Sequence, residues 1–245
     1  MKGIILAGGR GVRLQPLTKV ISKALLTVYN KPLIMYPLQT LIGAGIKEIL
    51  IVVPSDKVKD FKNLLGNGKE LGVKISYKVQ EEPKGMADAV FQGKNFVGKD
   101  NVVVIAADNI YEDSFEKAVK SFKSGCRIFL NKVPDPERFG VLKFNKKGKP
   151  VDVVEKPKKF ISNYVVTAMY IYDCRVFDIV KKMKPSGRGE LEITDLIRWY
   201  LNRGELDYRY LKGKYIDAGT FDSLLEANIF IARKEGSRLA KTCKI

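Results

Sequence analysis

Two patterns of hydrophobic residues alternate along the first half of the chain. Continuous apolar runs, which are typical of strands buried on both faces of a sheet, occupy residues 2–7, 48–53, 73–79, 102–107 and 126–133. Stretches with helical periodicity lie between them, at residues 33–44, 56–65, 86–97 and 114–124. This alternation predicts an α/β fold in which helices cover both faces of a largely parallel sheet.

The pattern changes after Pro134. Strand-like runs separated by turns lie at residues 140–145, 150–155 and 163–172, and they predict antiparallel or mixed additions to the sheet. Helical stretches follow at residues 175–183, 193–203 and 221–234, with a short strand at 215–216. Because no repeat or low-complexity linker interrupts the chain, we expect one domain over residues 1–245 with an elaborated C-terminal half.

Composition narrows the class of protein. No apolar run approaches the roughly 18 residues that span a membrane, and the N-terminus enters a strand without the cleavage site of a signal peptide. The three cysteines, Cys126, Cys174 and Cys243, have neither metal-ligand nor disulfide spacing. We therefore expect a cytoplasmic protein that does not act at a membrane.

Charge and residue types restrict the chemistry. The absence of histidine excludes His-based catalysis and His-ligated zinc, and it leaves carboxylates to hold a hard cation such as Mg²⁺. The formal net charge of +17 raises nucleic-acid binding as an alternative. Because the lysines are spread along the chain and interrupted by acidic residues, we interpret the charge as a bias toward polyanionic small substrates, without specific nucleic-acid binding.

A glycine-rich, cationic loop follows the first apolar run. It contains Gly8, Gly9 and Gly11, and then Arg10, Arg13, Lys19, Lys23 and Lys31 with no acidic residue among them. Glycines let backbone N–H groups approach an anion, and the cations neutralise it, so the loop suits nucleotide phosphates. The glycine spacing matches neither common phosphate-loop pattern, which leaves an ordinary surface turn as the alternative.

Two aspartates follow predicted strands in the two halves of the chain. Asp108 ends the run at 102–107, and Asp217 follows the strand at 215–216. Open α/β sheets bind ligands at the carboxyl ends of their strands, and two carboxylates can hold a hydrated Mg²⁺ that also binds phosphate. Taken singly, each aspartate could instead serve a turn or a helix-capping loop.

Three further positions carry candidate chemistry. Gln80 lies just past a strand, and its amide could read a base edge or simply be solvated. Glu155 and Lys156 could bind a sugar hydroxyl and a phosphate, or form an exposed turn before Pro157. The segment 187–195 could be a second active loop, although Thr194 and Asp195 could equally cap the following helix.

The order of these motifs resembles a known family. The stretch LAGGRGVRLQPLTKVISKALLTVYNKPLI resembles the signature of sugar-1-phosphate nucleotidyltransferases. Further matches follow in family order: VQEEPKGMADA, ADNI, DPERFGV, VEKP, SNYVVTAMYIYD, GELEITD and YIDAGT. The later motifs are most similar to the glucose-1-phosphate thymidylyltransferase branch.

The resemblance implies a Rossmann-like, GT-A-like sheet, with a nucleotide-binding half at 1–133 and a sugar-phosphate-binding half at 134–245. It assigns the nucleotide to Leu6, Gly8, Gly9, Gly11, Val12, Arg13, Lys23, Gln80, Gly85 and Asp108. It assigns the sugar phosphate to Asn109, Gly140, Glu155, Lys156, Val166 and Tyr170, and Mg²⁺ to Asp108 and Asp217. The implied catalytic set is Arg13, Lys23, Asp108, Lys156 and Asp217, and the implied assembly is a homo-oligomer.

The sequence departs from the family pattern inside the glycine loop. Val12 replaces the usual threonine, and Arg10 replaces a small residue. Thr27, Ala107 and Ala168 also stand where other residues are usual, which leaves the reaction class intact but affects fine specificity.

The resulting expectation is an enzyme that makes dTDP-glucose and pyrophosphate from dTTP and glucose 1-phosphate with Mg²⁺. Because uracil lacks only the thymine methyl group, a UTP-using enzyme is the nearest alternative. A non-catalytic nucleotide-sugar-binding protein is a second alternative.

Overall fold

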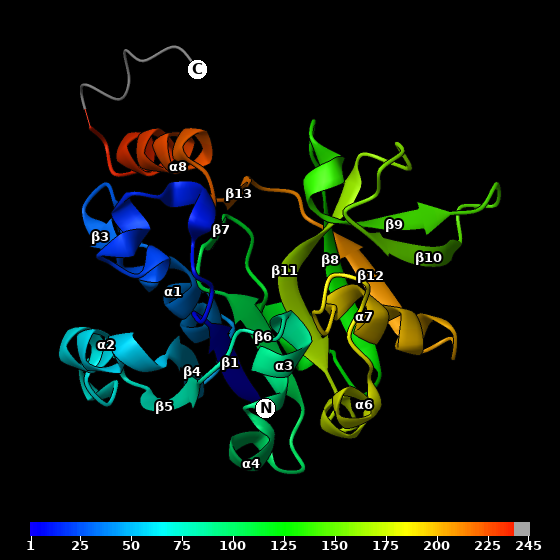
Figure 1. Ribbon diagram of the computed structural model, residues 1–245, viewed down its shortest axis with the longest axis horizontal. Coiled ribbons are helices and arrows are strands. Elements are labelled where there is room, and N and C mark those ends of the chain that lie inside the picture. The colour runs from blue at the N-terminus through cyan, green and yellow to red at the C-terminus, as the bar shows by residue number, and fades with distance from the viewer. Residues whose placement is uncertain (238–245) are drawn as a thin grey trace.

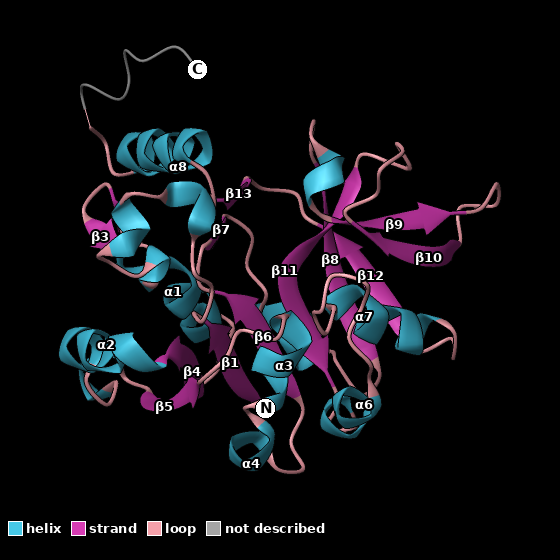
Figure 2. Cartoon of the chain, in the orientation of Figure 1, coloured by secondary structure: helices cyan, strands magenta, loops and turns pink. Residues whose placement is uncertain are grey.

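The computed structural model describes residues 1–237 and is organised around one twisted central sheet flanked by helices (Figures 1 and 2). The sheet has nine strands, seven of which follow the order β10-β9-β11-β6-β1-β4-β5, while β8 pairs with β11 and with β12. Their bounds are β1 (Lys2–Leu6), β4 (Glu48–Pro54), β5 (Lys74–Gln80), β6 (Val102–Ala106), β8 (Cys126–Lys132), β9 (Gly140–Phe144), β10 (Pro150–Glu155), β11 (Tyr164–Tyr172) and β12 (Leu206–Tyr210).

The expected change from parallel to mixed pairing is confirmed. Strands β5, β4, β1 and β6 are mutually parallel, whereas β11 runs antiparallel to β6, β8 and β9. All five residues of β6 are buried, as its unbroken apolar run predicts for a strand covered on both faces.

Helices cover both faces of this sheet. Core residues of α3 (Met86–Phe91), α6 (Val176–Lys182) and α7 (Ile193–Leu201) pack on the face that carries Ile4 and Val104. Core residues of α1 (Met35–Gly43), α2 (Val58–Leu65) and α5 (Glu116–Lys120) pack on the face that carries Ile5 and Ile105. The helix α4 (Lys94–Val97) follows α3, and none of the helices within residues 1–237 is long and apolar enough to cross a membrane.

A short ribbon brings the C-terminal part of the chain to the centre of the fold. Strand β13 (Tyr215–Asp217) pairs antiparallel with β7 (Asn109–Tyr111), and Asp217 stands opposite Asn109. The helix α8 (Phe221–Lys234) follows directly and begins with a capping box between Thr220 and Ser223. It packs over the ribbon of β2 (Thr27–Val28) and β3 (Lys31–Pro32), as Figure 1 shows near the C-terminus.

Several local predictions were wrong in extent. The helix expected at 86–97 is split at Gly93, and the one expected at 114–124 is helical only over Glu116–Lys120. The sequence pattern did not predict β7 or β12, because β7 has three residues and β12 is a half-exposed edge strand with charged positions. The third cysteine of the sequence, Cys243, lies outside the described residues.

The close packing of Gly93 against the core can be tested. A Cβ on Gly93 would lie 2.3 Å from Cδ1 of the fully buried Ile4. We therefore expect Gly93→Ala to lower the free energy of unfolding by about 1–3 kcal/mol, measured by urea denaturation, as overpacked cores do. The exposed Gly43 at the end of α1 has no atom near such a Cβ, so Gly43→Ala should instead stabilise by about 0.5–1 kcal/mol. Equal effects of the two substitutions would contradict the packing explanation.

Candidate active site

A cleft of about 810 Å³ opens at the carboxyl ends of β1, β5 and β6. Residues from both halves of the chain line it, including Gly8 after β1, Asp108 after β6, Glu155 at the end of β10 and Asp217 in β13. This is the edge at which open α/β sheets bind ligands.

The glycine-rich loop forms one wall of the cleft. Gly11 has a left-handed backbone (φ 61°), and its carbonyl accepts a hydrogen bond of 2.7 Å from the Thr18 hydroxyl. A Cβ on Gly11 would lie 2.8 Å from Cγ2 of Thr18, so glycine is needed for both conformation and space. The turn directs Arg13 and Lys23 to the cleft, which both residues line.

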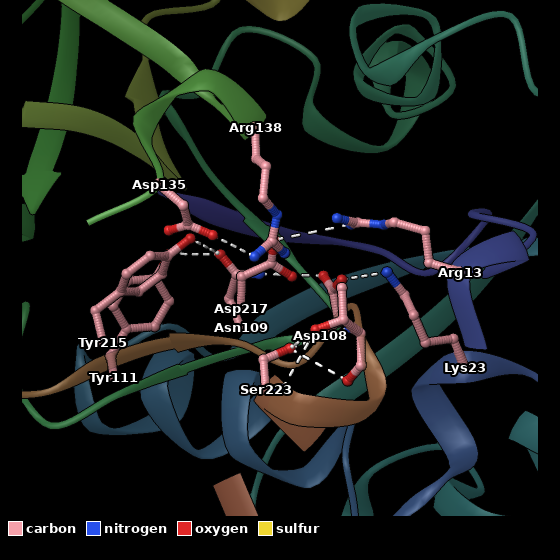
Figure 3. A network of polar contacts seen from close by, with 11 residues as sticks. Arg13, Lys23, Asp108, Asn109, Tyr111, Asp135, Arg138, Tyr215, Asp217 and Ser223 are labelled. Carbon is pink, nitrogen blue, oxygen red and sulfur yellow. Dashed lines mark hydrogen bonds and ion pairs between the residues drawn. The ribbon is translucent and has the colours of Figure 1, made fainter. Parts of the chain in front are cut away.

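The two aspartates expected to act together meet at the floor of the cleft (Figure 3). The ribbon of β7 and β13 places Asp217 beside Asp108 across the sheet register. Lys23 Nζ forms an ion pair with Asp108 Oδ2, and Arg13 Nη2 lies 4.0 Å from Asp217 Oδ2. Each carboxylate thus has its own cation from the loop that follows β1.

The pKa values of the two carboxyl groups are shifted in opposite directions. Burial raises the pKa of Asp108, but the charge and hydrogen bond of Lys23, together with hydrogen bonds to Asp217 and the backbone, hold that pKa below its usual value. Burial and then the negative charge of Asp108 raise the pKa of Asp217 to about 7. Asp217 is therefore the member of the pair for which the nearby charges of Lys23 and Arg13 do not outweigh burial and the repulsion from Asp108.

The arrangement fits a hydrated divalent cation. Asp217 Oδ1 is buried and, among residues 1–237, has no hydrogen-bond partner. Gly219 leaves room beside it, since a Cβ there would lie 2.8 Å from that oxygen and 2.6 Å from Arg13 Nη2. The described residues contain no group of three potential ligands that could hold a metal alone. Two carboxylates with substrate phosphates are the donor set that Mg²⁺ commonly takes in enzymes.

Asn109 is fixed next to this pair. Its Oδ1 accepts hydrogen bonds from the hydroxyls of Tyr215 (2.9 Å) and Tyr111 (3.2 Å), and its Nδ2 donates to Asp108 Oδ1 at 3.1 Å. Both tyrosine pKa values are raised by burial, so the hydroxyls remain donors. The amide orientation of Asn109 is thereby determined by its neighbours (Figure 3).

Glu155 and Lys156, at the end of β10, line the same cleft. Burial, and then the charge of Glu192, raise the pKa of Glu155, while Arg188 lies 3.5 Å from its Oε1. Lys156 is exposed and has a left-handed backbone (φ 43°), which is held by a 2.9 Å hydrogen bond from its N–H to the Phe139 carbonyl. A strained backbone that directs a lysine into a cleft points to a binding role.

Nearly all residues expected to bind substrate line this one cleft. The cleft-lining members of that set are Leu6, Gly8, Gly9, Arg13, Lys23, Gln80, Gly85, Asp108, Asn109, Gly140, Glu155, Lys156, Val166, Tyr170 and Asp217. Gly11 and Val12 are not among the lining residues, and Val12 is 64% exposed. Arg10 does line the cleft.

Two cleft residues were not assigned to the substrate site from the sequence, because Arg138 was not considered and Thr194 was considered only as part of a possible active loop or as a helix cap. Arg138 reaches over the carboxylates from the loop before β9, is paired with Asp135, and has a buried Nη2 with no hydrogen-bond partner within the described chain (Figure 3). Thr194 is buried in the cleft wall and does not cap α7, whose N-cap is Glu192. The position of Thr194 in the cleft wall favours the interpretation of residues 187–195 as an active loop. Arg138 lies in the motif DPERFGV and Thr194 in GELEITD, and these family motifs were the only sequence features that could have indicated a role in the site.

Comparison with known proteins identifies the family of the chain. The profile of the family described as Nucleotidyl transferase matches residues 2–234. The chain belongs to this family. It is 46% identical over 237 residues to the glucose-1-phosphate thymidylyltransferase of Neisseria meningitidis, an alignment that covers 94% of this chain and 82% of that protein. It is 44% identical over 248 residues to the enzyme of the same name from Mycobacterium tuberculosis, covering 98% of this chain and 86% of that protein.

Solved structures extend the similarity to the fold. A proposed glucose-1-phosphate thymidylyltransferase of Bacillus anthracis, crystallised in complex with a sucrose, superposes with a TM-score of 0.89 at 43% identity and covers 100% of this chain and 97% of that one. A UDP-glucose pyrophosphorylase in complex with UDP-glucose has a TM-score of 0.83 at 26% identity, covering 95% of this chain and 98% of that one. The expected Rossmann-like mixed sheet is confirmed.

The raised pKa of Asp217 gives a prediction for Asp217→Asn in metal-free buffer. A carboxyl whose folded-state pKa is raised loses stabilising protonation as pH rises from about 4 toward 7. The melting temperature of the variant, relative to wild type, should therefore increase by a few degrees between pH 5 and pH 8. Asp222→Asn, on the exposed first turn of α8, is the control substitution. A relative melting temperature of Asp217→Asn that stays constant or falls between pH 5 and pH 8 would contradict the assignment.

Proposed function

We propose that this protein transfers a thymidylyl group from dTTP to glucose 1-phosphate, giving dTDP-glucose and pyrophosphate. The observation that carries the proposal is one cleft lined both by Arg13, Lys23, Asp108 and Asp217 and by Glu155 and Lys156. The loop cations and aspartates suit a triphosphate, and the pair at the end of β10 suits a phosphorylated sugar. The relatives of known name support the choice of substrates.

The reaction joins a phosphate oxygen of glucose 1-phosphate to the α-phosphorus of dTTP. The bond between that phosphorus and the α–β bridging oxygen breaks, and pyrophosphate leaves with the electron pair. The attacking oxygen is already anionic, so no general base is required, which is consistent with a chain that contains no histidine. Positioning and charge neutralisation supply the rate.

Each residue has a role in this scheme. Arg13 and Lys23 neutralise the triphosphate and the departing pyrophosphate, while Lys156 orients the attacking phosphate. The fixed amide of Asn109 and the carboxylate of Glu155 hold sugar hydroxyls. Asp108 and Asp217 would hold Mg²⁺, which supplies charge neutralisation to the phosphates when bound. The homo-oligomer and the cytoplasmic location stay predictions.

A UTP-using reaction is the second candidate. It is favoured by the similarity to a UDP-glucose pyrophosphorylase over nearly the whole chain. Pyrophosphate release should be measured for dTTP, UTP, dCTP, ATP and GTP against several sugar 1-phosphates. We expect the highest kcat/KM for dTTP with glucose 1-phosphate, and release with no pair would reject both candidates.

Asp108→Asn should lower kcat by at least about a hundredfold, the scale of losing a principal electrostatic group. The fold should persist, because the amide keeps the shape of the side chain and its bond from Asn109. Near-normal turnover, measured by pyrophosphate release at saturating Mg²⁺, would remove metal binding by Asp108 from the mechanism.

Lys156→Ala should raise the KM for glucose 1-phosphate by roughly tenfold or more, since a charge-assisted hydrogen bond to phosphate is lost. The KM for dTTP should change little. Lys158→Ala, which removes an exposed lysine that does not line the cleft, is the matched control. An effect of Lys156→Ala confined to dTTP would reverse the assignment of the two subsites.

A further inference from the structure

Gln80 is held at the wall of the cleft by contacts on both sides of its amide. The residue ends β5, is 7% exposed and lines the cleft. Its Nε2 donates a 2.7 Å hydrogen bond to Asp88 Oδ2, from the first turn of α3. Its Oε1 faces Gly8, where a Cβ would lie only 2.5 Å away.

The Asp88 contact determines which way the amide points. An ionised carboxylate only accepts hydrogen bonds, so Gln80 must present Nε2 to Asp88 and keep Oε1 on the other side. A flipped amide would bring Oε1 against the carboxylate, which is repulsive. Within residues 1–237, Oε1 accepts no hydrogen bond and is not a buried unsatisfied atom, so it remains available to a ligand.

The surroundings of Gln80 suit a flat heterocycle. Leu6, Pro83, Met86 and Ala89 line this end of the cleft with apolar surface, and Gly8 belongs to the loop that leads to Arg13 and Lys23. A nucleotide whose phosphates meet those cations would place its base in this slot. The inference below therefore rests on the proposed nucleotidyl transfer.

We propose that Asp88 is a positioning residue that fixes the Gln80 amide, so that the slot presents a hydrogen-bond acceptor and selects pyrimidines that carry a ring N–H at N3. Thymine and uracil carry N–H at N3 and can donate to Oε1. Cytosine has a bare acceptor nitrogen at N3 and an amino group at C4, so its N3 would oppose Oε1. Asp88 thus enforces the choice of an imide-bearing pyrimidine without touching the nucleotide.

The alternative is that Asp88 only stabilises the start of α3. Acidic residues in the first turn stabilise helices through the helix dipole, and Asp88 occupies such a position. Asp60 occupies the same position in α2 and is exposed. Asp60→Asn therefore removes an equivalent helix-start charge and is the matched control.

Asp88→Asn tests the proposal, because asparagine keeps the size but can accept from Nε2 or donate to a flipped Oε1. Dissociation constants of dTTP and dCTP are measured by calorimetry with Mg²⁺ and without sugar phosphate. The preference for dTTP, taken as the ratio of the two constants, should fall by roughly five- to tenfold, as expected for one hydrogen bond. Asp88→Ser, which can also donate or accept, should give the same loss, and Asp60→Asn should leave the ratio unchanged.

A double-mutant cycle separates positioning from general destabilisation. In a Gln80→Ala background, Asp88→Asn should have no further effect on the ratio, since Asp88 acts through Gln80. Equal weakening of dTTP and dCTP, or an undiminished effect in that background, would overturn the proposal. Because binding is measured without turnover, a wild type that prefers dTTP but releases no pyrophosphate would refute the proposed reaction while still supporting the role of Asp88.

Discussion

The active-site cleft depends on the antiparallel pairing of β7 with β13. Each strand has only three residues, yet their register places Asp217 opposite Asn109 and next to Asp108. Two buried carboxylates at close range repel each other, and such a pair persists only where positive charge compensates it. Lys23 and Arg13 supply that charge from the first loop of the chain, so the site joins the beginning, the middle and the end of the described fold.

Regular secondary structure surrounds the two buried carboxylates of Asp108 and Asp217. Asp108 follows a strand whose five residues are all buried, and α8 begins directly after β13 with a capping box. The hydroxyls of Tyr111 and Tyr215 fix Asn109 beside the carboxylates. Preorganised groups of this kind need not be rearranged when charge develops, which is how electrostatic catalysis gains its effect.

The sequence predicted the parts of the fold that are encoded locally. Unbroken apolar runs located β1, β4, β6 and β8 to within a residue or two, and the end of β6 located Asp108. The proximity of Asp217 rested on family resemblance, because pairing between three-residue strands leaves no periodic signal. The contact between Asp88 and Gln80 was equally invisible, since it joins a strand end to a helix start through a single side-chain hydrogen bond. Val12 was placed in the nucleotide site by motif alone, whereas it does not line the cleft.

The charges in the cleft also explain why this basic protein does not bind every anion equally well there. Lys23 is paired with Asp108 and Arg13 lies near Asp217, so the cations next to the two carboxylates are already partly neutralised. A polyanion that arrived alone would have to compete with Asp108 for Lys23. If a divalent cation accompanied the phosphates, Asp108 and Asp217 would hold it and Lys23 would be left to bind phosphate oxygens. The balance of charge at the cleft would then favour a phosphate ligand that brings a divalent cation, whereas the net charge of +17 alone would not distinguish it from an arbitrary anion.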